Sequence, residues 1–392
     1  MGIDSTSAER RLRVVVIDHV ARLSGGEIAL LRLLPALVRH VDVHVVLGED
    51  GPLVERLIAR GIETEVIPLA PRLRDVRRET VRPTRLDPRA IVNVPVSVLR
   101  LSRRLRALDA DLVHTNSLKA AFYGGLAARL AGVPAMWHVR DRIASDYLPR
   151  AAVVLVRVAA RFLPAAVVAN SRATLETLPA LRSASVLYNP IVPDAVEPLT
   201  AIERPKTGKP TIGVVGRLAP WKGQDVFLDA FAQAFRGANV RARIIGSALF
   251  GEDAYAESLR RQAEQLGIAG QVEFRGFRED VWAELRELEV LVHCSVRPEP
   301  FGQVVLEGMA AGVPVIAAAA GGPAELITDG VDGVLTTPGD SAALAAAMRR
   351  LIDDPDLREQ LAAAGRRRSG DFTPERTAAR LLDVYRLLVS RA

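Results

Sequence analysis

Short runs of Val, Ile and Leu alternate with longer amphipathic runs along most of the chain. The runs at residues 12–18, 112–114, 290–292 and 313–318 have the length and composition of buried strands. The runs at 28–38, 225–235 and 374–390 have helical composition. Strands and helices in this alternation predict βα units with parallel sheets. At 392 residues the chain is long enough for two such domains, each with a full core.

A proline-rich stretch separates the two predicted halves. Residues 190–210 include Pro193, Pro198 and Pro205 and show little periodicity, so we interpret them as a linker. We therefore expect one Rossmann-like domain over residues 1–192 and a second over residues 193–373. The ligand is expected between the two halves.

Two glutamates eight positions apart, Glu299 and Glu307, lie where a predicted strand gives way to a predicted helix. Pro298 and Pro300 end the strand, and helical composition begins at Gly302. Such a helix start presents free N–H groups and a positive dipole end at the sheet edge, where a diphosphate can bind. A carboxylate there can accept hydrogen bonds from ribose hydroxyls, and a second can face a sugar. For an isolated pair, two solvated carboxylates would be the better interpretation.

A second segment at residues 213–223 also follows an apolar strand and precedes an amphipathic helix. It contains Gly216, Arg217 and Lys222. Arginine offers a bidentate fork to phosphate oxygens and lysine a mobile point charge, so the pair can neutralise a leaving diphosphate without a metal. Downstream, Gly321 and Gly322 follow the strand at 313–318, where a backbone can approach a ligand or turn tightly. Each feature alone would indicate a surface cation or a loop.

Together these segments resemble the family 4 retaining glycosyltransferases, whose GT-B fold has two Rossmann-like domains facing each other across a cleft. The segments at 213–223, 299–307 and 321–333 occur in the family's order. The resemblance implies that Arg217 and Lys222 hold the diphosphate and Glu307 the ribose hydroxyls. It implies that Glu299 and the Phe301 and Gly302 backbone hold the donor sugar. The donor-binding residues predicted in this half are Gly216, Arg217, Lys222, Glu299, Phe301, Gly302, Gln303, Val304 and Glu307.

The N-terminal half matches the family more weakly. Gly25 and Gly26 follow the first strand like the family's glycine loop and would let a backbone approach the diphosphate or acceptor, although an ordinary strand-to-helix turn explains them nearly as well. His138 occupies the place of the family's His-Asp motif and is the candidate to contact the donor sugar or acceptor hydroxyl. A lone histidine is more often structural, and here the aspartate is displaced to Asp141. The helix within 374–392 resembles the family's terminal helix, which packs back on the first domain.

We therefore expect a metal-independent, retaining hexosyltransferase that uses a nucleotide-diphosphate sugar, with UDP or GDP favoured, as co-substrate and needs no other cofactor. Its catalytic residues would be His138, Arg217, Lys222 and Glu299. The first domain would bind the acceptor, which can be a sugar, a lipid-linked molecule or a small metabolite, and the second would bind the donor. Two alternatives stay open. One is a GT-B hydrolase, phosphorylase or epimerase of nucleotide sugars, and the other is a non-catalytic partner subunit.

Composition limits the cellular compartment and the classes of partner that we expect. The single cysteine, Cys294, excludes an internal disulfide and a cysteine-rich zinc site, and the polar start is unlike a signal peptide, so we expect a cytoplasmic protein. The net charge is +6, and arginines gather in residues 72–89, which could contact an acceptor, an anionic membrane face or only solvent. No aromatic residues interleave them, so nucleic acid is not expected. Residues 151–169 come nearest to a membrane span, but Arg157 and Arg161 each cost about 2.5–3.5 kcal/mol on insertion.

Overall fold

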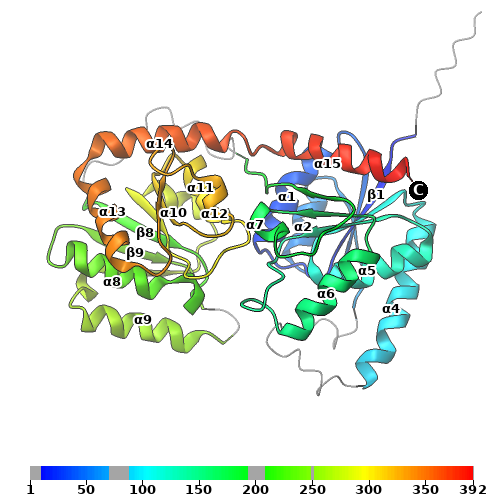
Figure 1. The fold of residues 1–392 in the computed structure, drawn as a ribbon, viewed down its shortest axis with the longest axis horizontal. Helices are drawn as coiled ribbons and strands as arrows, with labels where there is room; N and C mark the ends of the chain where they lie inside the picture. Colours follow the sequence, from blue (N-terminus) through cyan, green and yellow to red (C-terminus); the bar gives the residue numbers. More distant parts are fainter. Residues whose placement is uncertain (1–9, 70–87, 193–207, 249–250, 392) are drawn as a thin grey trace, which may run out of the picture. The chain divides into compact units, whose positions relative to one another are not determined.

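The computed structural model describes residues 10–69, 88–192, 208–248 and 251–391, with side chains omitted at 88–94. It divides into two compact units, one of residues 1–190 and 374–392 and the other of residues 191–373 (Figure 1). Each unit is built on one parallel sheet, which confirms the predicted pair of Rossmann-like domains. Most of the predicted linker and the side chains of the arginine-rich region at 72–89 lie outside the described residues.

The first unit has a seven-stranded sheet in the order β3-β2-β1-β4-β5-β6-β7. Its strands are β1 Arg13–Asp18, β2 Asp42–Leu47, β3 Glu63–Val66, β4 Leu112–Thr115, β5 Ala135–Val139, β6 Ala166–Ala169 and β7 Ala184–Val186. Its helices are α1 Gly25–Leu37, α2 Pro52–Ile58, α4 Pro88–Ala107, α5 Leu118–Ala131, α6 Arg150–Phe162, α7 Arg172–Leu175 and α15 Pro374–Val389.

Alternate side chains of β1 pack on opposite faces of this sheet. Val14 and Val16 join a core with α1, α2 and α15, whereas Val15 and Ile17 join a core with α4 and α5. Helix α6 packs on the same side as α5, in a cluster around the buried Trp137. The sheet is therefore covered on both faces, as a parallel sheet requires.

The second unit has a six-stranded sheet in the order β10-β9-β8-β11-β12-β13. Its strands are β8 Thr211–Val215, β9 Arg241–Ile245, β10 Val272–Gly276, β11 Val290–His293, β12 Val315–Ala318 and β13 Val334–Thr336. Its helices are α8 Gln224–Phe235, α9 Asp253–Gln265, α10 Val281–Arg286, α11 Gln303–Ala310, α12 Pro323–Leu326, α13 Ser341–Asp353 and α14 Pro355–Ser369, with short 3₁₀ helices η4 Pro220–Lys222 and η5 Ala269–Gln271.

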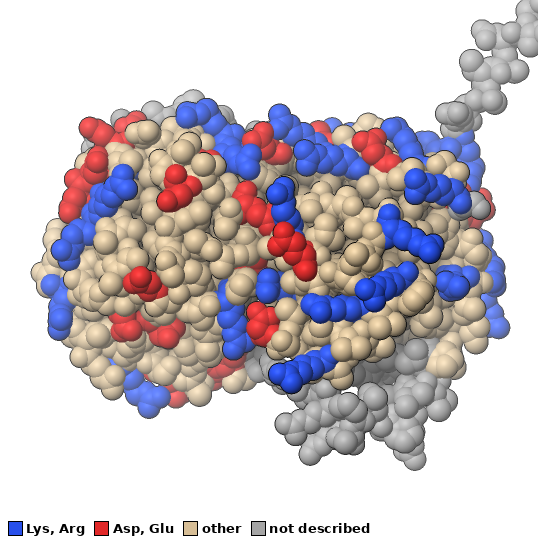
Figure 2. Space-filling view, viewed as in Figure 1, with Lys and Arg blue, Asp and Glu red and all other residues tan. Residues whose placement is uncertain are grey.

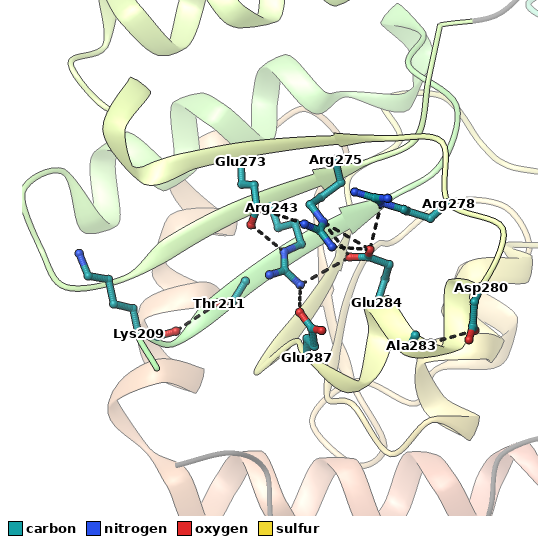
Figure 3. Close-up of polar contacts among 10 residues, drawn as sticks. All are labelled: Lys209, Thr211, Arg243, Glu273, Arg275, Arg278, Asp280, Ala283, Glu284 and Glu287. Atoms are coloured by element: carbon teal, nitrogen blue, oxygen red, sulfur yellow. Dashed lines mark hydrogen bonds and ion pairs between the residues drawn. The ribbon is translucent and has the colours of Figure 1, made fainter. Parts of the chain in front are cut away.

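The core of the second unit is supported at one edge of its sheet by a charged network. Helices α8, α9 and α13 pack on one face of the sheet. At the edge, Glu284 of α10 lies 3.5 Å from Arg243, 3.0 Å from Arg275 and 3.2 Å from Arg278 (Figure 3). Arg243 also pairs with Glu273 at 3.1 Å. Because Glu284 and Arg243 are both buried, each depends on the other charges for compensation.

Both sheets have a point where the strand order reverses. In the first unit β1 and β4 are neighbours, and in the second β8 and β11 are neighbours. The loops after such a pair of parallel strands diverge to opposite faces and leave a crevice at the carboxyl edge, where ligands of open α/β sheets bind. The predicted site residues follow these strands, apart from His138, which lies within β5.

Candidate functional site

Glu299 is the centre of a hydrogen-bonded cluster in the second unit. Lys222, at the end of η4 beyond β8, donates from Nζ to Glu299 Oε1 at 2.8 Å. His293, the last residue of β11, places Nε2 at 2.5 Å from Glu299 Oε2, and Ser295 Oγ donates to the same oxygen at 3.1 Å. Two predicted residues that are far apart in the sequence thus meet at the switch point of this sheet.

The cluster holds an ionised carboxylate. Burial alone would raise the pKa of Glu299, but Lys222 and His293 outweigh it and hold that pKa well below its usual range. The Lys222 ammonium also lies 4.5 Å from the centroid of the Trp221 ring, a cation–π contact. The result is a preorganised, largely buried cation that pairs with the Glu299 carboxylate.

Two glycines hold the Glu299 loop against the neighbouring strand connection. Gly321 has φ +71°, and a Cβ there would lie 2.2 Å from the Glu299 carbonyl oxygen. At Gly322 a Cβ would lie 2.3 Å from the Phe301 carbonyl oxygen, and the Gly322 N–H donates to Glu299 O at 2.9 Å. The tight approach predicted for this pair is therefore made to the site loop itself.

Helix α11 begins directly after this loop. Gly302 is its N-cap with φ +89°, Phe301 before it is buried, and Gln303 and Val304 form its first turn. Glu307 follows in the next turn and is buried. Since the first N–H groups of a helix have no intrahelical acceptor, this end of α11 can bind an anion.

Arg217 also lies near Trp221. Its guanidinium carbon is 5.9 Å from the Trp221 ring centroid, and its Nε is 3.3 Å from Glu252 Oε2. The Gln224 side chain donates to Arg217 O at 2.9 Å and fixes the backbone. Gly216 before it has φ +149°, and a Cβ at Gly246, directly after β9, would lie 2.0 Å from the Gly216 carbonyl oxygen. Arg217 and Lys222 therefore both lie near one indole ring.

A second polar cluster lies at the switch point of the first unit. Asp18 ends β1, and Asn116 donates from Nδ2 to Asp18 Oδ2 at 2.6 Å. Arg140, directly after β5, donates from Nε to Asn116 Oδ1 at 2.9 Å and from Nη1 to Asn189 Oδ1 at 2.6 Å. All four side chains are buried. The positive charge of Arg140 is thus held by hydrogen bonds at the carboxyl edge of the sheet.

His138 is buried in β5 beside this cluster. Its ring stacks on His114, whose Nε2 is 3.1 Å from His138 Nδ1 and whose Nδ1 is 2.6 Å from the Tyr385 hydroxyl. Burial, together with Arg140, lowers the pKa of His114 to about 3 and the pKa of His138 well below its usual range, so both rings are neutral.

The hydrogen bonds also assign the His138 tautomer. Arg140 Nη2 lies 3.3 Å from His138 Nδ1, and a guanidinium can only donate, so Nδ1 accepts and the ring proton is on Nε2. That Nε2 is buried and has no hydrogen-bond partner within the described residues. A buried unsatisfied donor favours a ligand oxygen at this point.

The glycine loop of the first unit differs from expectation. Gly25 and Gly26 open helix α1, which begins before the predicted residue 28. The N–H and hydroxyl of Ser24 both donate to the Glu27 carboxylate, the N–H at 3.2 Å, and this capping interaction outweighs the poor helix propensity of glycine. A Cβ at Gly26 would lie 3.1 Å from Arg140 Cδ. Gly26 therefore makes room for that arginine.

The predicted residues fall into two groups. His138, Gly25 and Gly26 belong to the first unit and the remainder to the second. Arg140, His293 and Ser295 were not predicted, although each follows or ends a buried strand, where polar residues of a parallel sheet gather. Cys294 is buried, donates to Lys222 O at 3.3 Å, and has a thiol pKa raised to about 12 by burial. It supports the Lys222 backbone.

Asp141 does not contact His138 in the manner of a His-Asp pair; it accepts a hydrogen bond from the Tyr147 hydroxyl at 2.9 Å. In the described parts of the chain, no three His, Cys, Asp or Glu side chains gather in a metal-binding arrangement. None of the helices described is both long enough and apolar enough to cross a bilayer. The cytoplasmic location stays a prediction.

Two parallel α/β units with polar clusters at both switch points define a class of two-domain proteins that bind ligands at the carboxyl ends of their strands. Residues 23–195 match the sequence profile described as Glycosyltransferase Family 4, and residues 197–368 match that of Glycosyl transferases group 1. The D-inositol 3-phosphate glycosyltransferase of Streptomyces scabiei is 30% identical over 301 residues, or 70% of this chain and 67% of that protein. The chain belongs to the family 4 glycosyltransferases with the GT-B fold.

Other relatives agree over shorter lengths. The D-inositol 3-phosphate glycosyltransferase of Streptomyces coelicolor is 35% identical over 196 residues, which are 47% of this chain and 43% of the relative. The chain spans less than half the length of several curated relatives that it matches. Among solved structures, Anabaena Alr3699/HepE in complex with UDP has a TM-score of 0.81 and 26% identity, over 96% of this chain and 100% of that chain. HepE has also been solved with UDP-glucose.

Proposed function

We propose that this protein transfers a sugar from a nucleotide-diphosphate sugar, with UDP or GDP as the nucleotide, to an acceptor hydroxyl with retention of configuration and without a metal. The observation that carries the proposal is the buried Lys222–Glu299 pair beside the N-terminus of α11. It offers a cation and helix N–H groups to a diphosphate, and a carboxylate to a sugar, at one switch point. The HepE complexes with UDP and UDP-glucose support a donor of this kind.

Each donor group has a residue to bind it. The diphosphate would lie at the start of α11, between Lys222 and Arg217, and the ribose hydroxyls would donate to Glu307. Glu299 would accept hydrogen bonds from the sugar, because its pKa keeps it ionised. The backbone of Phe301 and Gly302 and the first turn at Gln303 and Val304 would complete the site.

The charge that develops during the reaction explains why two cations would lie at the diphosphate. As the bond from the anomeric carbon to the diphosphate oxygen breaks, negative charge grows on the diphosphate and positive charge on the sugar. Lys222 and Arg217 would stabilise the former. The acceptor oxygen then forms the new bond on the same face of the sugar, and its proton passes to the departing phosphate oxygen. A sugar trapped covalently on Glu299 would contradict this route.

His138 would act in the first unit as a hydrogen-bond donor. Its Nε2 proton and its depressed pKa suit a contact with a sugar or acceptor hydroxyl and exclude a role as a general base at that nitrogen. Gly25 and Gly26, beside Arg140, would place the start of α1 near the same ligand.

Calorimetric titration with UDP-, GDP-, ADP- and dTDP-sugars, in the presence of EDTA, tests the donor site. We expect one donor class to bind, and Glu307→Ala to weaken it about ten- to a hundredfold, or roughly 1.5–3 kcal/mol. Glu257→Ala, an exposed glutamate on α9, is the matched control. Absence of binding to all four classes would favour a non-catalytic partner subunit.

The reaction is tested separately, because a hydrolase, phosphorylase or epimerase would bind the same donor. Donor consumption is followed by proton NMR with and without a mixture of sugar and lipid-linked acceptors, and the anomeric coupling of the product reports retention or inversion. Consumption that is equally fast without acceptor would contradict glycosyl transfer.

A further inference from the structure

Exposed apolar side chains are concentrated on one group of helices in the first unit. Among the described residues, eight of the twelve large hydrophobic side chains with high exposure lie on α4, α5 and α6. Four are on α6 alone, where Val154, Leu155, Val158 and Phe162 are between 47% and 68% exposed. Leu126 and Leu130 of α5 are also exposed. Single exposed apolar residues are normal, but a cluster of this kind marks an interaction surface.

Helix α6 is apolar on two opposite faces. Val153, Val156 and Ala160 are buried in the core of the first unit, whereas Leu155, Val158 and Phe162 project outward. Its 13 residues span only about 20 Å, whereas a membrane-spanning helix needs roughly 20 residues, or about 30 Å. A short helix with an outward apolar face and basic neighbours is suited to lie in the plane of a membrane surface.

The charged side chains on these three helices have one sign. The sequences of α4, α5 and α6 contain no Asp or Glu. Arg150 and Arg161 are exposed on α6, and Arg129 of α5 donates to the Phe162 carbonyl at 3.2 Å, which places its guanidinium at the end of α6. Figure 2 shows basic and uncharged side chains over α5 and α6.

The nearest acidic side chain before α6 is already paired. Asp146 lies 3.5 Å from Arg142, four residues earlier. The positive charge over α5 and α6 is therefore not balanced by the segment that leads into α6.

We propose that the α6 surface, made of Leu126, Leu130, Val154, Leu155, Val158 and Phe162 with Arg129, Arg150 and Arg161, docks on an anionic lipid bilayer. The apolar side chains would enter the headgroup boundary, and the arginines would contact lipid phosphates. A second copy of the chain is a poorer occupant, because a two-fold contact would bring the same arginines together. The proposal does not depend on the nucleotide-sugar site, which lies in the other unit.

Co-sedimentation with vesicles tests it on the full-length protein. Wild type is mixed with vesicles of phosphatidylcholine alone, or of phosphatidylcholine with about 30 mol% phosphatidylglycerol, which gives the surface a negative potential. We expect binding to the anionic vesicles that falls by at least about tenfold in Leu155→Asp/Phe162→Asp and weakens with added salt. The matched control is Ile58→Asp/Phe277→Asp, two exposed apolar residues outside the α6 surface.

Three results would overturn the proposal: no binding of wild type to either vesicle, equal binding to both vesicles, or an equal loss of binding in the two double variants. Light scattering after size exclusion, without lipid, identifies the competing occupant. A wild-type dimer that Leu155→Asp/Phe162→Asp converts to a monomer would assign the surface to a second copy and would also overturn it. Circular dichroism of both variants confirms that the substitutions leave the fold intact.

Discussion

Glu299 links the ionisation of one side chain to the stability of the second unit. Its pKa is held below the ordinary value by Lys222 and His293, so its stabilising effect is present above the pKa of an unfolded glutamate and is lost as the pH falls below it. We expect Glu299→Gln to lower the free energy of unfolding at pH 7 by about 1–3 kcal/mol, because Lys222 loses its counter-ion. The gap should shrink in urea titrations below roughly pH 4.5.

Glu257→Gln, at an exposed position, should give no gap at any pH. A gap between wild type and Glu299→Gln that stays constant down to pH 3 would show that the carboxylate charge is not what stabilises the loop.

Glu27 should have the opposite pH dependence. Burial and the nearby Asp18 raise its pKa to about 7, so between the unfolded value near 4.5 and pH 7 the folded state binds more protons than the unfolded state. Stability from this group therefore falls as the pH rises through that window, by up to ~3 kcal/mol. Glu27→Gln keeps a capping side chain and removes the ionisation.

The difference in unfolding free energy between Glu27→Gln and wild type, measured by urea titration, should move in favour of the variant from pH 4.5 to pH 8. Both proteins contain His114 and His138, so the contribution of these histidines to the pH dependence cancels in the difference. A difference that does not change with pH would mean that Glu27 is not protonated in the folded protein.

The residues of the site were predictable only where each carries its own signal. Arg217, Lys222 and Glu299 follow apolar strands and stand next to glycine or proline, so the sequence analysis could place them at a sheet edge. Arg140 could not be assigned in this way, because its role depends on Asn116 and Asn189, which come from strands whose order in the sheet is not a local property.

At the scale of elements, substitution of Gly321 by alanine should cost more stability than its left-handed backbone conformation alone explains. Gly321 and Gly330 both have φ +71°, but a Cβ meets the Glu299 backbone only at Gly321 and meets nothing within 4 Å at Gly330. Both alanine variants should lose about 1–2 kcal/mol from left-handed strain. Gly321→Ala should lose more, and should also weaken nucleotide binding in calorimetry because the Glu299 loop must move. Equal effects of the two substitutions on binding would contradict this.

In the network of Figure 3, a buried and an exposed partner of one arginine should contribute differently to the free energy of unfolding. Glu284 and Glu287 both contact Arg243, but the Glu284 side chain is 7% exposed and that of Glu287 is 55% exposed. We expect Glu284→Gln to cost about 1.5–3 kcal/mol, since buried charges lose a partner, and Glu287→Gln to cost less than about 1 kcal/mol. Urea denaturation of the two variants at neutral pH measures both. Equal costs would show that solvent screens the whole network.

The whole-molecule architecture was predictable because it repeats one unit. Alternating strand and helix patterns, once assigned to parallel sheets, leave few topologies open, and both observed sheets have the same reversal of strand order. The start of α1 was predicted later than it occurs, since Gly25 and Gly26 have poor helix propensity and the cap that overcomes it depends on side-chain geometry.

The return of α15 to the first unit makes the fold of that unit depend on the end of the chain. Leu381, Leu382, Tyr385 and Leu388 are buried in its core, at about 1.5–3 kcal/mol each, and together this equals the whole stability of a typical domain. We expect a chain ending at residue 373 to lose the first unit, seen as protease sensitivity and a lost thermal transition, while a chain ending at residue 389 melts like wild type. Because the donor residues belong to the second unit, the shorter chain should still bind the nucleotide with similar affinity in calorimetry. Loss of nucleotide binding along with the first unit would show that the donor site needs both.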